Sequence, residues 1–207
     1  MCAGHLQQRH TGAVDVVDGW VFDLDGVVWR GAEPIPGVPA AIAELQASGA
    51  EVLFVTNMSA YPVRTVEERL ASLGVDAQGR VLTSAMAAAR LVEPGQRVLV
   101  CGGPGLVEQA EARGAVVVDA GPADAVIVGY HRDFDYARLT AAMRAVRGGA
   151  VLIGTNDDAT YPSDEGLLPG NGALLAAVAT ASGVEPVVAG KPNAPMCALV
   201  RDRLDGR

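Results

Sequence analysis

The stretch WVFDLDGVVW, residues 20–29, places two carboxylates, Asp23 and Asp25, directly after a short apolar run and just before a glycine. The run has the length of a buried strand, and the acids stand where that strand would end. In a parallel sheet, residues just past the carboxyl ends of the strands gather in one crevice, where ligands bind. The stretch therefore predicts a functional site at the end of the first strand of such a sheet.

The rest of the chain alternates apolar segments of strand length with segments of helical period, the pattern of repeated βαβ units. Half of the residues are apolar but only 4% are aromatic, so we expect a core of Val, Leu, Ile and Ala and an α/β fold. Thr65 and Glu68 have capping-box spacing, which predicts a helix start at Thr65. The expected strands cover residues 20–22, 52–55, 98–101, 116–118, 126–128, 151–153 and 187–189. The expected helices cover residues 38–45, 65–73, 84–92, 106–113, 136–146, 173–181 and 195–204.

The overall charge argues against two classes of partner. The formal net charge is -8 and the pI is near 4.8, so the chain repels nucleic-acid backbones and anionic lipid surfaces. The first twenty residues contain no apolar stretch of signal-peptide length, and the sequence has no run of 18 apolar residues. We expect a soluble, cytoplasmic protein that binds neither nucleic acid nor membrane.

Polar residues also follow two other expected strands, and all of them should meet at one rim of the sheet. Thr56 and Asn57 follow the second strand, and Lys191 follows the last. With Asp23 and Asp25 they provide two acids, a hydroxyl, an amide and a cation. This set suits a phosphorylated ligand and a hard metal ion.

Other interpretations of the acidic pair remain open at this point. A calcium loop of the EF-hand type is excluded, because Val27 and Val28 stand where an acid or amide and a glycine are needed. A DxD pair that holds a metal-bound sugar nucleotide, as in glycosyltransferases, is possible, and so is a purely structural turn. The glycine-rich segment CGGPG (101–105) does not complete a dinucleotide fingerprint, since Glu108 replaces its third glycine, and we interpret it as a tight turn.

Three segments together resemble the first three motifs of the haloacid dehalogenase superfamily of phosphatases: FDLDGVVW (22–29), VTNMSA (55–60) and AGKPNAP (189–195). The segments ADAVIVGYHRDFDYARL (123–139) and GTNDDATYPSDEGLLPGNGAL (154–174) resemble the subfamily with a large α/β cap, which includes nitrophenyl-, pyridoxal- and sugar- or nucleotide-phosphate phosphatases. The resemblance implies a Rossmann-like parallel-sheet core at 14–83 and 187–207, with the cap at 84–186. It further implies a Mg²⁺-dependent phosphatase of small-molecule phosphomonoesters and, as in many relatives, a homodimer through the cap.

The resemblance also implies roles for the rim residues. Asp23 would attack phosphorus and form an aspartyl-phosphate, and Asp25 would protonate the leaving oxygen and then activate water. Asp23 and the main-chain carbonyl of Asp25 would hold the Mg²⁺. Thr56, Asn57 and Lys191 would bind the phosphoryl group, with Lys191 offsetting its charge. Asp157 and Asp158 are expected in a cap loop, as candidates for contact with the substrate.

The sequence departs from the family at its carboxyl end. The fourth motif, an acidic GDxxxTD-like segment after a strand, is absent, and Asp202 and Asp205 belong to an expected helix rather than to a metal site. We therefore expect a core that is incomplete at its C-terminus, in a fragment of a longer protein or a degraded relative. Residues 20–22 would form an edge strand, and the chain would bind Mg²⁺ weakly, hydrolyse esters slowly and tend to associate. A non-catalytic domain that keeps the fold for binding or assembly is the competing hypothesis.

Overall fold

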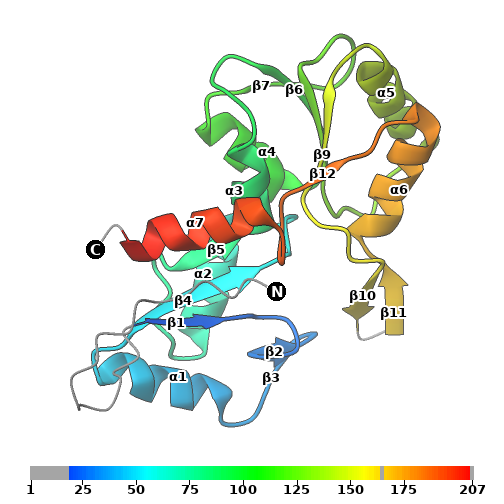
Figure 1. Ribbon diagram of the computed structural model, residues 1–207. Helices are drawn as coiled ribbons and strands as arrows, with labels where there is room; N and C mark the ends of the chain where they lie inside the picture. The colour runs from blue at the N-terminus through cyan, green and yellow to red at the C-terminus, as the bar shows by residue number, and fades with distance from the viewer. Residues whose placement is uncertain (1–18, 164–165, 206–207) are drawn as a thin grey trace.

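The computed structural model describes residues 19–163 and 166–205, which form two parallel β-sheets with helices on their faces (Figure 1). The predicted start of the first unit, residue 14, lies outside the described residues. No helix in the described part of the chain is long and apolar enough to cross a membrane. The α/β class and the parallel pairing predicted from the sequence are confirmed.

The first sheet has three strands, and its central strand ends at the functional rim. Val52 and Phe54 of that strand pack on one face, and Leu53 and Val55 pack on the other, because side chains alternate along a strand. The strands, in order, are β1 (Gly19–Phe22), β4 (Glu51–Thr56) and β5 (Val81–Thr83). The helices around this sheet are α1 (Val38–Ala47), α2 (Val63–Ser72), α3 (Ser84–Ala89) and α7 (Ala194–Asp205). Among the described strands β1 pairs only with β4, so it lies at the edge of this sheet, as predicted.

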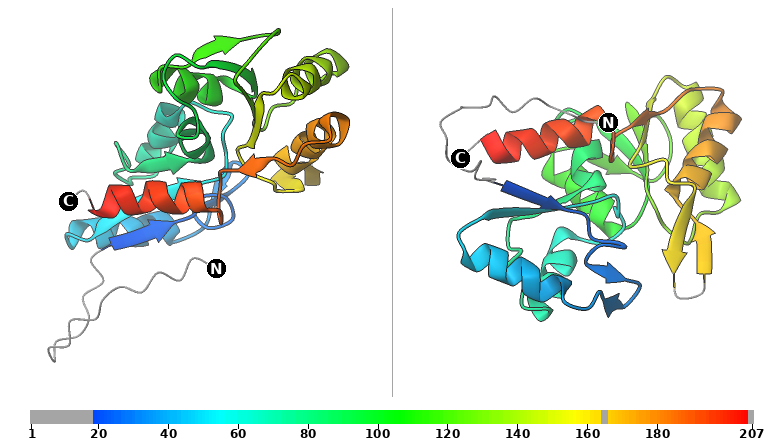
Figure 2. Two further views of the ribbon diagram at one scale, coloured as in Figure 1. Left: turned by 45° about the horizontal axis from the view of Figure 1, so that its top comes forward. Right: turned by 60° about the horizontal axis from the view of Figure 1, so that its bottom comes forward.

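The second sheet has five strands and lies beside the first (Figure 2). Apolar side chains of the two sheets belong to one buried cluster. The strands of the second sheet, in order, are β12 (Val187–Val188), β9 (Val151–Gly154), β8 (Ala125–Val128), β6 (Arg97–Cys101) and β7 (Val116–Val118). Its helices are α4 (Pro104–Ala112), α5 (Tyr136–Arg147) and α6 (Asn171–Ser182). Leu53 of the first sheet and Ile127 of the second belong to one buried cluster, with alanines of α3 between the sheets. This packing holds the carboxyl ends of the strands of the two sheets next to each other.

Two short antiparallel hairpins complete the fold. They are β2 (Trp29–Arg30) with β3 (Glu33–Pro34), and β10 (Thr160–Ser163) with β11 (Gly166–Pro169). Neither hairpin was predictable from the sequence, because their strands are short and most of their side chains are exposed or only partly buried. Both hairpins lie close to the rim where the candidate site residues gather (Figure 1).

Two expectations differ from the structure in detail. The capping box at Thr65 is wrong: α2 begins at Val63 with Pro62 as its N-cap, and the Thr65 amide donates to the Pro62 carbonyl at 3.0 Å. The ring of Pro62 fixes a φ of -53°, which is compatible with starting a helix earlier. Strand β12 pairs with β9 in the five-stranded sheet, whereas we had placed residues 187–207 in the first unit. The chain therefore leaves the second sheet only after β12, and the division into two domains stays a prediction.

Candidate active site

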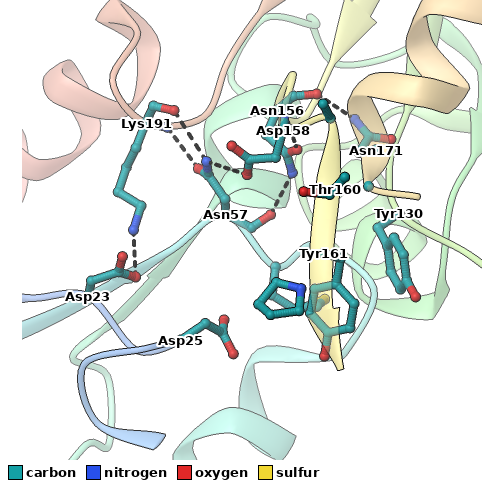
Figure 3. Close-up of a pocket in the computed structure, with 14 residues that line it drawn as sticks. Asp23, Asp25, Asn57, Tyr130, Asn156, Asp158, Thr160, Tyr161, Asn171 and Lys191 are labelled. Atoms are coloured by element: carbon teal, nitrogen blue, oxygen red, sulfur yellow. Dashed lines mark hydrogen bonds and ion pairs between the residues drawn. The ribbon is translucent and has the colours of Figure 1, made fainter. Parts of the chain in front are cut away.

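A cavity of about 430 Å³ lies between the carboxyl ends of the two sheets (Figure 3). Its walls carry acids, amides, hydroxyl groups and one lysine. On the side of the first sheet they include Asp23, Asp25, Asn57, Met58 and Lys191. On the side of the second sheet they include Tyr130, Asn156, Asp158, Thr160, Tyr161 and Asn171. Four of the five residues predicted for the site therefore line one cavity.

The ion pair between Asp23 and Lys191 is the shortest charged contact at the cavity. Lys191 Nζ lies 2.6 Å from Asp23 Oδ1, and it also donates to the carbonyl of Val55 at 3.1 Å. The main-chain amide of Leu24 donates to the same carboxylate oxygen at 2.7 Å. Both charged side chains are partly exposed, so the pair adds little to stability. It serves to orient the carboxylate of Asp23 toward the cavity.

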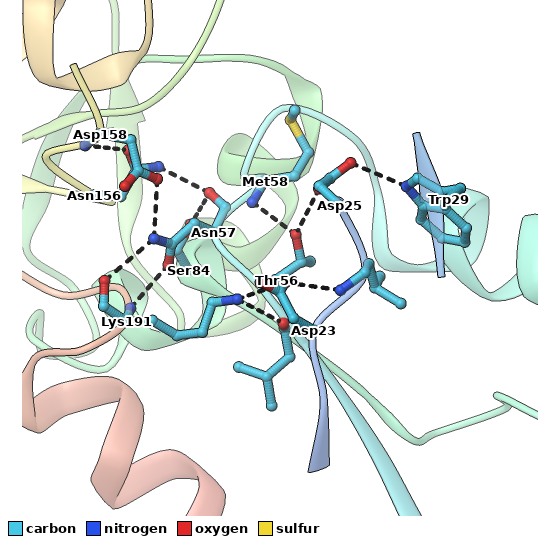
Figure 4. A network of polar contacts seen from close by, with 12 residues as sticks. Asp23, Asp25, Trp29, Thr56, Asn57, Met58, Ser84, Asn156, Asp158 and Lys191 are labelled. Carbon is cyan, nitrogen blue, oxygen red and sulfur yellow. Dashed lines mark hydrogen bonds and ion pairs between the residues drawn. The ribbon is translucent and has the colours of Figure 1, made fainter. Parts of the chain in front are cut away.

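Asp25 is held by hydrogen bonds to both of its carboxylate oxygens (Figure 4). The indole N–H of Trp29 donates to Oδ1 at 3.0 Å, and the hydroxyl of Thr56 donates to Oδ2 at 3.4 Å. Thr56 Oγ1 in turn accepts from the amide of Met58 at 3.0 Å. The side chain of Thr56 is only 1% exposed, so its hydroxyl supports Asp25 from behind the cavity wall. Sequence reasoning placed Thr56 at the rim but missed Trp29.

Asn57 connects the two sides of the site. Its Oδ1 accepts from the main-chain amide of Lys191 at 2.8 Å. Its Nδ2 donates to the main-chain carbonyl of Lys191 at 3.2 Å and to Asp158 Oδ2 at 3.0 Å. A Cβ at Gly190 would lie 2.5 Å from Asn57 Oδ1, so the glycine lets the two segments approach. The side-chain amide of Asn57 therefore fixes the position of Lys191.

The residues on the side of the second sheet come from the loops that follow β8 and β9, from β10 and from the start of α6. Asn156 donates to the carbonyl of Asn57 at 2.9 Å, and its Oδ1 accepts from the amide of Asp158. The ring of Tyr161 packs against that of Tyr130, tilted by 40° and with 5.2 Å between the ring centroids. Burial, and then the nearby carboxylate of Asp25, raise the pKa of Tyr161, so its hydroxyl stays protonated at neutral pH. Of these residues the sequence had indicated only Asp158. The position of the loop just after a strand was the signal available for Asn156.

The donor atoms at the cavity suit a hard cation. Asp23 and the main-chain carbonyl of Asp25 offer oxygen, which Mg²⁺ prefers, and Mg²⁺ commonly keeps several waters beside one or two carboxylates. Among the described residues, no group of three His, Cys, Asp or Glu side chains gathers to hold a metal. Asp202 lies on α7, in the helix predicted there, and pairs with Arg90. These residues fit Mg²⁺ as part of a coordination shell that water and substrate oxygens would complete.

Comparison with known proteins identifies relatives over most of the chain. The model of haloacid dehalogenase-like hydrolases matches residues 20–116. The acid sugar phosphatase of Staphylococcus saprophyticus is 38% identical over 178 residues, which are 84% of this chain and 69% of that protein. The acid sugar phosphatase of Staphylococcus aureus is 37% identical over the same coverage.

Solved structures show the same similarity in three dimensions. The glycerol phosphate phosphatase of Mycobacterium tuberculosis, solved in complex with magnesium, has a TM-score of 0.83 and 36% identity, covering 91% of this chain and 58% of that one. The p-nitrophenyl phosphatase of Archaeoglobus fulgidus has a TM-score of 0.85 and 32% identity, covering 91% of this chain and 74% of that one. Since sequence motifs, fold and relatives agree, the chain belongs to the haloacid dehalogenase-like hydrolases.

Proposed function

We propose that this protein hydrolyses small-molecule phosphomonoesters, with Asp23 as nucleophile and Asp25 as general acid and base. The observation that carries the proposal is the contact between Lys191 and Asp23 at a cavity that Asp25 also lines. A carboxylate beside a cation and a second acid is the arrangement that in-line attack on a phosphate ester needs. The relatives named as phosphatases support the same chemistry.

The reaction would proceed in two displacements. A carboxylate oxygen of Asp23 forms a bond to phosphorus while the bond from phosphorus to the leaving oxygen breaks, and the electron pair stays on that oxygen. The leaving oxygen takes the proton of Asp25. Water then attacks phosphorus while the bond from phosphorus to the Asp23 oxygen breaks, and Asp25 accepts a proton from this water, so that phosphate is released and the carboxylate of Asp23 is regenerated.

The remaining rim residues would position the reacting groups and offset the negative charge of the phosphoryl group and of Asp23. Lys191 would attract the phosphoryl oxygens and offset the charge on Asp23. Thr56 would hold Asp25, and Asn57 would hold Lys191, as their hydrogen bonds suggest. Mg²⁺, held by Asp23 and the main-chain carbonyl of Asp25, would neutralise negative charge on the phosphoryl group.

The substrate would be a small molecule, because the cavity measures about 430 Å³ and is bounded on the side of the second sheet by residues from the segments after β8 and β9. We propose that residues 84–186 act as a cap that contacts the leaving group, through side chains such as Asp158 and Tyr161. Sugar, glycerol and nitrophenyl phosphates are the substrate classes to test first, because the relatives are named for them.

The test is hydrolysis of 4-nitrophenyl phosphate and glycerol 3-phosphate with Mg²⁺. We expect Asp23→Asn to reduce turnover to background, and Lys191→Met to lower kcat by about 100-fold or more. Asp119→Asn, the same change at an exposed acid that is not among the residues lining the cavity, should leave activity unchanged. Turnover that survives Asp23→Asn would remove the proposed nucleophile. Binding of the esters without any turnover by the wild type would favour a non-catalytic domain.

A further inference from the structure

Trp29 is brought next to Asp25 by a tight turn in the first motif. The main-chain amides of Val28 and Trp29 both donate to the carbonyl of Leu24, at 2.8 and 3.2 Å. The amide of Gly26 donates to the carbonyl of Trp29 at 2.7 Å, and Gly26 has the positive φ of 81° that this turn requires. The local fold therefore places the indole of Trp29 beside the carboxyl group four residues earlier in the chain.

The indole of Trp29 can only donate a hydrogen bond. Trp29 is 4% exposed, and its N–H lies 3.0 Å from Asp25 Oδ1. A buried N–H that lost this acceptor would carry a desolvation cost, so the contact is strongly favoured. Oδ1 accepts the shorter bond from Trp29, whereas Oδ2 accepts only the long bond of 3.4 Å from Thr56, so Oδ2 is the oxygen better placed to exchange a proton with a substrate.

The ring of Trp29 is itself fixed by α2. The guanidinium carbon of Arg69 lies 4.0 Å from the centre of the Trp29 ring, in a cation–π contact. Arg69 also donates to the carbonyl of Gly31 at 2.6 Å, which ties α2 to the turn that joins β2 and β3. Arg69 on α2 therefore fixes the ring of Trp29, and Trp29 in turn fixes the carboxyl group of Asp25.

Asp25 needs such a support because there is free volume on two sides of it. It lines the cavity of about 430 Å³ and also a second one of about 230 Å³, which Trp29, Tyr61 and Arg69 share. A carboxyl group next to two cavities can turn about its terminal torsion angle, whose preferences are broad. The bond from Thr56 is long at 3.4 Å, so the shorter bond from Trp29 is the stronger restraint.

We propose that Trp29, fixed by Arg69, is a positioning residue that aims Asp25 at the leaving oxygen of the substrate. This inference rests on the proposed function, in which the bond from phosphorus to the leaving oxygen breaks and that oxygen takes the proton of Asp25. An alkoxide leaving group needs this proton, whereas 4-nitrophenolate is a stable anion and needs little help. Loss of Trp29 should therefore slow the hydrolysis of alkyl esters selectively.

The kinetic test compares kcat and KM for glycerol 3-phosphate and 4-nitrophenyl phosphate in Trp29→Phe, which keeps an aromatic ring and removes the N–H. We expect kcat for the alkyl ester to fall by about tenfold or more, with KM nearly unchanged, and kcat for the aryl ester to fall by less than about threefold. Arg69→Met should act in the same direction with a smaller effect. Trp20→Phe, the same change at a 41% exposed tryptophan, is the matched control and should leave both esters unaffected. Equal losses for the two esters, or a rise in KM alone, would overturn the proposal.

A spectroscopic readout tests the contact without turnover. The chain has two tryptophans, so its proton–nitrogen spectrum has two indole signals, and Trp20→Phe identifies that of Trp29. We expect the Trp29 signal to exchange slowly with solvent and to shift on Asp25→Ala, while the Trp20 signal stays in place. A Trp29 signal that does not shift on Asp25→Ala would refute the inference. If the wild type hydrolyses neither ester, the proposed function is wrong, and a responsive Trp29 signal still supports Trp29 as the residue that orients Asp25.

Discussion

Lys191 is restrained at both ends of its side chain, although lysine is a flexible residue. Asn57 binds its main-chain amide and carbonyl, while Asp23 and the carbonyl of Val55 bind its ammonium group. Such restraint lowers the entropic cost of placing a charge beside a phosphoryl group. A lysine at this site is thus positioned before any substrate arrives.

Another single residue, Cys101, makes the free energy of unfolding depend on pH. Burial raises the pKa of the Cys101 thiol from 9.0 to about 11, against a smaller opposite effect of Arg138. Between these two values the unfolded chain loses this proton while the folded chain keeps it, so the free energy of unfolding must fall as pH rises. We expect Cys101 to contribute a loss of up to about 3 kcal/mol across this range. The measurement is urea unfolding of wild type and Cys101→Ala from pH 8 to 11; parallel curves for the two proteins would contradict the prediction.

The sequence predicted which residues share the rim but not how they bind one another. The rule that strand ends converge was enough to group the five residues, which lie at or shortly after the ends of strands: Asp23, Asp25, Thr56, Asn57 and Lys191. Their hydrogen bonds could not be predicted, because Asn57 meets Lys191 across 134 positions of sequence. Trp29 was missed for a different reason: an apolar residue after DxDG looks like core, and only the turn at Gly26 shows that its N–H reaches Asp25.

At the scale of elements, the loop after β4 is packed against the start of α4. The amide of Gly105 donates to the carbonyl of Ala60 at 2.9 Å, and a Cβ at Gly103 would lie 2.6 Å from that carbonyl oxygen. The segment CGGPG leads directly from β6 into α4 and does not form the predicted tight turn; its glycines instead allow one segment of backbone to approach another. This contact joins the first sheet to the second close to the candidate site.

Substitutions at the glycines of CGGPG should lower the free energy of unfolding by different amounts, although these glycines are close in sequence. A Cβ at Gly105 would lie 2.1 Å from the main-chain oxygen of Tyr61, whereas a Cβ at Gly102 would meet the flexible end of Leu106 at 2.7 Å. Since backbone cannot move aside easily, Gly105→Ala should lower the free energy of unfolding by about 2 kcal/mol or more, and Gly102→Ala by less than about 1 kcal/mol. Chemical denaturation of the two variants measures the difference, and equal losses would speak against the close approach.

The elements themselves were predictable where periodicity was strong. All seven predicted strands appear, because apolar runs of strand length leave a clear signal, most of all in β4 and β8, which are buried on both faces. The helix start at Thr65 was wrong because Pro62 supports an earlier one. The sequence could not show which sheet β12 joins, because β12 has only two residues and its pairing with β9 depends on tertiary packing.

At the scale of the whole molecule, one buried cluster spans both sheets. Leu53 and Leu82 of the first sheet share it with Val98 and Ile127 of the second, and Ala88 of α3 lies in the same cluster. The walls of the candidate active site therefore belong to parts of the chain that are packed together. In the described structure the distance between Asp23 and Asp158 is set by this core as well as by the hydrogen bonds of Asn57.

The β1 edge of the first sheet is open to association in the described structure. Among the described strands β1 has a partner on one side only, and its Trp20 and Val21 are 41% and 48% exposed. Unpaired strand edges with apolar side chains recruit other chains, and a lysine on the edge opposes this. We expect the wild type to self-associate at micromolar concentrations and Val21→Lys to shift it toward monomer, as measured by sedimentation velocity.

Val151→Lys is the matched control for this prediction. Val151 is 54% exposed but belongs to β9, which has strands on both sides, and the substitution changes the net charge by the same amount. If association depends on pairing at the β1 edge, Val151→Lys should associate like the wild type. If both lysine variants become monomeric to the same extent, general charge repulsion is responsible and the edge is not. A wild type that stays monomeric throughout would show that β1 is already protected from pairing.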